Sequence, residues 1–142
     1  MPQVLRNILS ALAGIIMGSV LNWGLIKVGE LLIPLPSGAD VSTPEGLKAA
    51  IPLFEFKHFL FPLIAHALGT LFGAFVAVRL SGIGSVRPAM VVAAFFLIGG
   101  AAMIMELPAP MWFNITDLVV AYIPMGLLGY RLAKRNIPDQ GA

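Results

Sequence analysis

Two groups of polar side chains in this sequence could do chemistry, and both occur in otherwise apolar segments. His66 and Asn22 belong to the first group. An imidazole exchanges protons near neutral pH, whereas a carboxamide only donates and accepts hydrogen bonds. At about 1.5 Å of rise per helical residue, Asn22 and His66 lie roughly 15 and 12 Å below the expected outer boundary, near the bilayer midplane. We expect either an interhelical hydrogen bond between them or a proton-carrying or ligand-binding site.

The second group lies near the outer ends of the same apolar segments. Glu30, Glu106 and Asp117 come from three different segments, and His58 lies at the same level. Converging carboxylates would form an acidic vestibule that attracts cations. In an alternative interpretation, His58, His66, Glu106 and Asp117 provide nitrogen and oxygen ligands for zinc, iron or manganese. The acidic vestibule requires no cofactor, and the alternative interpretation requires only such a metal.

Two of the three acids also have a local structural interpretation. The run Asn114-Ile115-Thr116-Asp117 fits a capping pattern, with Asn114 as the N-cap and Asp117 at the third helical position. Glu30 follows Lys27 by three residues and could pair with it on one helix face. Glu106 is preceded by eighteen uncharged residues and has no such local partner. Its position therefore calls most strongly for a functional explanation.

The composition places these residues in a membrane. The chain is 58% hydrophobic and 11% charged, whereas roughly a quarter of the residues of a soluble domain are charged. Four apolar segments are long enough to span a bilayer, and they occupy most of the 142 residues. We predict one all-α membrane domain over 1–142, a polytopic bundle of four transmembrane helices. The expected spans are about 5–33, 58–80, 88–107 and 115–132, with an outer loop at 34–57.

The distribution of charge predicts an orientation. Short cytoplasmic loops carry an excess of lysine and arginine. Six of the nine basic residues fall on one side of the expected membrane, and six of the seven acids fall on the other. We therefore expect both termini in the cytoplasm and the protein in a membrane such as the bacterial inner membrane. Because topology accounts for the basic residues, we expect no nucleic-acid partner. The six basic residues expected on the cytoplasmic side are Arg6, Arg79, Arg87, Arg131, Lys134 and Arg135.

The outer loop is expected to contain a short helix. Thr43-Pro44-Glu45 combines an N-cap residue, a first-turn proline and a first-turn acid, and Pro52 ends or bends the helix. Its residues Leu47, Ile51 and Phe54 recur at helical spacing and form one apolar side. Such a helix lies in the membrane interface or folds over the mouth of the bundle.

Small residues and one proline predict how the spans pack. Gly14 and Gly18 form one GxxxG step, and Gly69 and Gly73 form another. These steps let backbones approach closely, either within one bundle or between subunits. Pro124 should kink the fourth span and free a backbone carbonyl near Val120.

Three functions fit this sequence. The first is a transporter or channel for a small cation or solute, with the acidic vestibule above a His66 and Asn22 midplane site. Because four helices are few for a pathway, this hypothesis implies a homo-oligomer in the lipid bilayer. The second is a membrane metal-binding protein or metalloenzyme. The third is an accessory or scaffold subunit without chemistry of its own, and enzymatic activity in general is not favoured.

Overall fold

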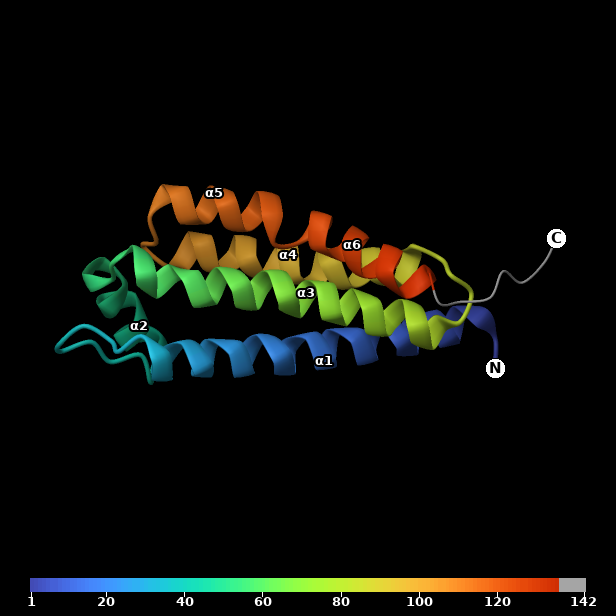
Figure 1. The fold of residues 1–142 in the computed structure, drawn as a ribbon, viewed down its shortest axis with the longest axis horizontal. Coiled ribbons are helices and arrows are strands. Elements are labelled where there is room, and N and C mark those ends of the chain that lie inside the picture. The colour runs from blue at the N-terminus through green and yellow to red at the C-terminus, as the bar shows by residue number, and fades with distance from the viewer. Residues whose placement is uncertain (136–142) are drawn as a thin grey trace.

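The computed structural model describes residues 1–135 and confirms the all-helical bundle. Four spans are long and apolar enough to cross a membrane, and they run along the long axis of the molecule (Figure 1). The long helices are α1 (Gln3–Leu32), α3 (Leu60–Ser81), α4 (Arg87–Glu106) and the pair α5 (Met111–Val120) and α6 (Ile123–Lys134). The connection from α1 to α3 holds α2 (Pro44–Ala50) and the 3₁₀ turns η1 (Ile51–Leu53) and η2 (Phe56–Phe59).

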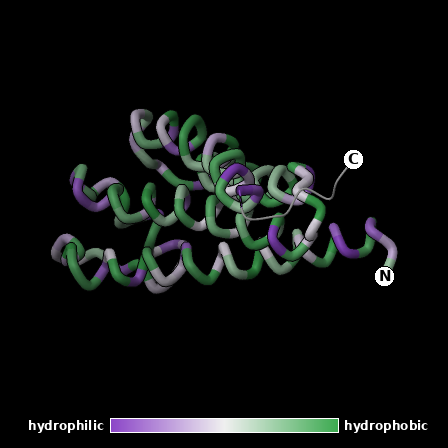
Figure 2. The backbone as a smooth tube through the Cα atoms, turned by 45° about the vertical axis from the view of Figure 1, so that its right-hand side comes forward, coloured by the Kyte–Doolittle hydropathy of each residue, from purple (hydrophilic) through white to green (hydrophobic). Residues whose placement is uncertain are grey.

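The two ends of the bundle differ in chemistry. The basic end carries the start of α1, the end of α6 and the turn between α3 and α4, while the loop end carries α2 (Figure 1). Hydrophobic residues predominate along the spans, and much of the hydrophilic sequence lies toward the ends (Figure 2). At the basic end, Arg6 Nε donates to the Leu80 carbonyl at 3.1 Å and Gln3 Nε2 donates to the Ser81 carbonyl at 3.3 Å. These contacts join α1 to α3.

Small residues hold α1 and α3 together toward the basic end. An added Cβ at Gly18 would lie 2.6 Å from the Gly69 carbonyl oxygen, and one at Gly73 would lie 2.6 Å from that of Gly14. The two GxxxG steps therefore pack against each other within this chain. Residues that point outward include large apolar ones such as Ile16 and Ile98. This arrangement suits lipid, where close packing rather than water exclusion associates the helices.

The fourth span is broken near Pro124, as predicted. Helix α5 ends at Val120, Tyr122 adopts φ −113° and ψ −79°, and α6 begins at Ile123. Pro124 has no N–H for the Val120 carbonyl, so the helical ladder cannot continue through this point. The break is sharp enough to divide the span into two helices.

The loop helix confirms its expected start. Thr43 Oγ1 accepts a hydrogen bond from the Gly46 N–H at 3.0 Å, and Glu45 lies in the first turn. The helix ends at Ala50 before the turn that contains Pro52. Leu47 lies in this helix, whereas Ile51 and Phe54 follow it, since the helix is shorter than expected, yet all three belong to one cluster with Phe59 and Phe113. Helix α2 and the turn after it therefore fold over the loop end of the bundle.

His58 ties this loop to the start of α3. Its Nδ1 accepts from the Glu55 N–H at 2.9 Å, and Nε2 lies 3.2 Å from the Pro34 carbonyl oxygen. Since Nδ1 accepts a backbone N–H, the proton of this imidazole is on Nε2, which donates to Pro34. His58 is thus a neutral structural histidine.

Candidate functional site

A cavity of about 360 Å³ lies toward the loop end, between α1, α3, α4 and α5. Aromatic and aliphatic side chains form most of its wall. Its aromatic residues are Trp23, Phe54, Phe59, Phe61 and Phe113. A volume of this size is within the range of small-molecule sites, which combine apolar walls with a few polar groups.

The central polar contact in this cavity joins α3 to α5. His66 Nδ1 and Asp117 Oδ1 are 2.7 Å apart, and both residues line the cavity. The Asp117 side chain is 3% exposed, whereas that of His66 is 27% exposed. A carboxylate buried in an apolar bundle is costly unless it is paired. The imidazole provides this partner and is the more accessible member of the pair.

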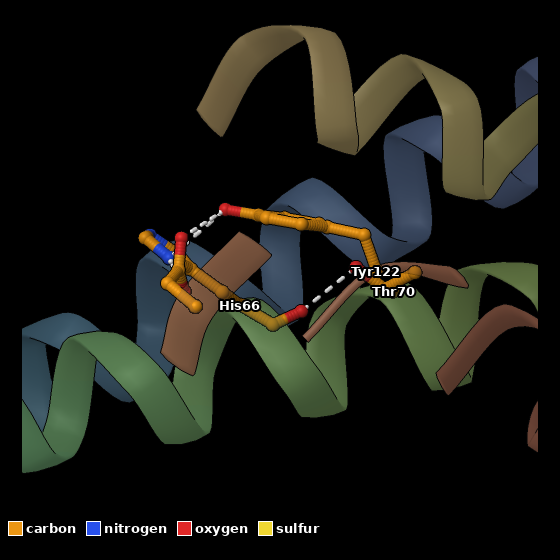
Figure 3. A network of polar contacts seen from close by, with 4 residues as sticks. His66, Thr70 and Tyr122 are labelled. Atoms are coloured by element: carbon orange, nitrogen blue, oxygen red, sulfur yellow. Dashed lines mark hydrogen bonds and ion pairs between the residues drawn. The ribbon is translucent and has the colours of Figure 1, made fainter. Parts of the chain in front are cut away.

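Tyr122 completes the site from the break between α5 and α6. Its hydroxyl donates to Asp117 Oδ2 at 2.5 Å and lies 3.3 Å from His66 Nδ1 (Figure 3). Gly100 on α4 makes room for the ring, because a Cβ there would overlap the Tyr122 hydroxyl. The break created by Pro124 thus directs a phenol toward the carboxylate five residues earlier.

With Asp117 ionised, these contacts fix the tautomer of His66. An ionised Asp117 only accepts hydrogen bonds, so both Tyr122 and His66 Nδ1 donate to it. With the proton on Nδ1, His66 Nε2 keeps its lone pair. Within residues 1–135, no hydrogen bond reaches this nitrogen. Thr70 Oγ1 donates to the His66 carbonyl at 2.8 Å, one helical turn along α3 (Figure 3).

The charge of the cavity follows from three residues. Of all the lysine, arginine, aspartate and glutamate side chains in residues 1–135, those that line the cavity are Lys27, Glu30 and Asp117. Lys27 Nζ and Glu30 Oε2 form an ion pair at 2.7 Å, as their spacing predicts. Their charges cancel, so with neutral imidazoles the cavity carries the single negative charge of Asp117.

The structure separates the other proposed site residues. Glu106 is exposed at the end of α4 and lines a different hollow, beside Thr43 and Lys48 of the loop. Asn22 lies against Gly69, and its Oδ1 is buried without a hydrogen-bond partner in residues 1–135. His66 bonds to Asp117 instead of Asn22. The structure therefore brings together His66 and Asp117, with Glu30 in the same cavity, but not Glu106 or Asn22.

The proposed metal ligands do not form a cluster. In the described part of the chain, no group of three or more His, Asp or Glu side chains is placed to hold a metal ion. His58 is engaged with Glu55 and Pro34, and Glu106 lies in the other hollow. The geometry accordingly gives no support to the metal alternative.

The capping interpretation of Asp117 is wrong. Helix α5 begins at Met111, directly after Pro110, so Asn114 and Asp117 both lie inside the helix. Asn114 Nδ2 donates to the Ala109 carbonyl at 3.3 Å, while Asp117 bonds across to α3. Pro110 ends the preceding extended segment and, with its fixed φ, starts this helix earlier than the capping pattern suggested.

Tyr122 is the site residue that sequence reasoning missed. Charge, histidine and asparagine mark a polar site within a span, whereas tyrosine does not stand out, because its ring is apolar apart from its hydroxyl. A signal was present, because Tyr122 lies two residues before Pro124 and far from either end of its span. A phenol at that depth requires a hydrogen-bond acceptor.

The fold and the site define a small helical membrane protein with an Asp–His–Tyr group at an apolar cavity. No protein-family model, characterised protein or solved structure matches the chain. The function is therefore inferred from the geometry of this site.

Proposed function

We propose that this protein is a small membrane transporter that binds a cation or solute in the loop-end cavity and exchanges it with a proton at His66. The observation that carries the proposal is the 2.7 Å contact between His66 and the buried Asp117 at this cavity. Intramembrane ionisable groups that face a cavity are characteristic of proton relays and substrate sites.

Each side chain has a distinct role in this proposal. His66 Nε2 accepts the proton, because Nδ1 already carries one and donates to Asp117. Asp117 stabilises the resulting imidazolium, and Tyr122 orients the carboxylate through Oδ2. Protonation of His66 changes the cavity charge from −1 to zero, so a bound cation and this proton oppose each other.

The break in the fourth span also supports transport. The break at Tyr122 separates α5, which carries Asp117, from α6, which packs closely on α3 through Gly129. Discontinuous helices beside a midplane site are common in transporters. Movement of α5 relative to α6 would change access to the cavity. Because four helices are few for a complete pathway, other copies of the chain would form the rest of it.

Proton flux into reconstituted vesicles tests the proposal. Vesicles contain a pH-sensitive dye, and an outward gradient of guanidinium provides the driving force, since this ion stays charged at neutral pH. The wild type should couple the gradient to proton entry. His66→Ala and Asp117→Asn should reduce this flux by at least about tenfold, because each removes a charge-assisted hydrogen bond of the site.

Glu106→Gln is the matched control, since it also neutralises an acid of the spans but lies outside the cavity. It should retain the wild-type flux. Equal proton entry in wild type, His66→Ala, Asp117→Asn and protein-free vesicles would refute the proposal.

A further inference from the structure

We infer that the cavity binds a protonated organic amine, whose ammonium group donates to His66 Nε2 and Asn114 Oδ1 and whose apolar body contacts the aromatic wall. This inference builds on the proposed function by naming the class of substrate. It depends on the hydrogen-bond acceptors of the cavity, its charge and its walls.

Asn114 provides the first acceptor. It lines the cavity one helical turn before Asp117 on α5, so the two side chains share a face. Its Nδ2 donates to the Ala109 carbonyl oxygen at 3.3 Å. The amide is not flipped, because a flip would place the Asn114 Oδ1 against the Ala109 oxygen, and neither atom could donate. Oδ1 is therefore held on the other side, buried and without a hydrogen-bond donor among residues 1–135. A buried carbonyl in this state gains stability from any donor that reaches it.

His66 provides the second acceptor. While Nδ1 donates to Asp117, the lone pair of Nε2 is available to a ligand N–H. Asp117 adds a negative charge one hydrogen bond behind the imidazole. The ligand is therefore a hydrogen-bond donor with positive charge, which describes a protonated amine better than an alcohol or a carboxylate.

The walls favour an organic cation over an inorganic one. A hard cation requires about six oxygen ligands, and the described residues contain no cluster of acidic or histidine side chains that could hold a metal ion. The cavity instead presents the rings of Phe59, Phe61, Phe113 and Trp23. Aromatic faces attract ammonium groups and bury the hydrocarbon attached to them.

The same geometry predicts how protons compete. A proton on His66 Nε2 removes the acceptor and cancels the charge of Asp117. The charged or titratable groups around His66 are Asp117 and Tyr122 on its Nδ1 side and the Lys27–Glu30 pair of α1 at the cavity wall. His58 also lines the cavity, where its imidazole is engaged with the Glu55 N–H and the Pro34 carbonyl. Amine binding should therefore weaken as the pH falls and His66 takes up a proton, as exchange between amine and proton requires.

Tryptophan fluorescence of the purified protein measures binding. The chain has two tryptophans, of which Trp23 lines the cavity while Trp112 packs against Phe56 and, edge to face, against Phe59. A Trp112→Phe background leaves Trp23 as the reporter. Three probes of similar shape are compared: 2-phenylethylammonium, its N,N,N-trimethyl derivative, which has charge but no N–H, and 2-phenylethanol, which is neutral.

We expect 2-phenylethylammonium to bind about tenfold more tightly than either other probe, as expected for one hydrogen bond that involves a charged group. Asp117→Asn should reduce the preference for ammonium over alcohol to about twofold or less. Asn114→Leu, which keeps the side-chain size, should remove most of the preference for ammonium over its trimethyl derivative. Glu106→Gln should preserve both preferences.

The outcomes separate this inference from the proposed function. Equal binding of the alcohol and the ammonium, or no effect of Asn114→Leu, overturns the amine site even if proton flux depends on His66. Selective ammonium binding that Asp117→Asn abolishes supports the amine site, even if the vesicles show no flux and the transport proposal fails. Fluorescence that responds to none of the probes overturns the inference.

Discussion

The two halves of the bundle contain the same four spans but pack in opposite ways. Toward the basic end, glycine and alanine bring backbones into contact, as Gly14 and Gly73 show. Toward the loop end, bulkier residues such as Phe59 and Phe113 surround a cavity and a polar site. In lipid, close van der Waals contact provides much of the helix association. The difference indicates that the small-residue half stabilises the bundle and leaves the other half free to bind.

The largest contrast should come from over-packing α4 in each half. Val92 is fully buried toward the basic end, whereas Ile104 lines the cavity. Val92→Phe should lower the free energy of unfolding by about 3 kcal/mol, since it forces a ring into a filled interior. Ile104→Phe should change it by less than about 1 kcal/mol because the cavity accepts the added atoms. Unfolding in mixed micelles of increasing SDS content measures both, and equal losses would mean that the halves are packed alike.

A smaller change tests the glycine contact itself. In Gly14→Ala, the new Cβ would meet the Gly73 carbonyl and lie 2.8 Å from the Ala77 Cβ. We expect a loss of about 2 kcal/mol in the free energy of unfolding, because backbone cannot move as a side chain does. Gly24→Ala is the control on the same helix, since its Cβ would meet nothing within 4 Å. It should be neutral or slightly stabilising, and an equal loss there would disprove the special role of the contact.

In the cavity half, the polar site should contribute less to stability than the glycine contact does. Tyr122→Phe removes the hydroxyl that donates to Asp117 at 2.5 Å and should cost about 1.5 kcal/mol in the free energy of unfolding. Tyr130→Phe is the control, because no hydrogen bond of the Tyr130 hydroxyl occurs within residues 1–135. The same micelle titration distinguishes the two. If the Tyr130 variant lost as much stability, the Asp117 bond would not be the cause.

The smallest effect concerns the loop above the cavity. The Ser42 hydroxyl and N–H donate to Asp40 Oδ1 at 2.6 and 2.8 Å, and they hold the pKa of this carboxyl below its usual 3.8. Since the folded-state pKa is lowered, the contact stabilises the loop above pH 3.8 and is lost as the pH falls through the lower value. Ser42→Ala should raise the Asp40 pKa toward 3.8 in a carboxyl NMR titration. An unchanged pKa would assign the shift to another cause.

Patterns along the chain were sufficient for much of the fold. Hydropathy and length predicted the four spans, Thr43 and Pro44 predicted the start of the loop helix, and Pro124 predicted the break. The GxxxG steps predicted close contacts, although only the structure showed that they meet within one chain. These features depend on local backbone chemistry or on one-dimensional periodicity, which a sequence displays directly.

The amino-acid sequence alone determined the class of protein and the position of each polar residue along its apolar helix, because both follow from counting residues. Only the tertiary structure decided which side chains meet. Asn22 and His66 were expected at one depth, yet Asp117 and Tyr122 bond to His66 and Glu106 lies elsewhere. Successive side chains on a helix point about 100° apart around its axis. The hydrogen-bond partner of a side chain therefore depends on where its helix starts and on how that helix is rotated against its neighbours.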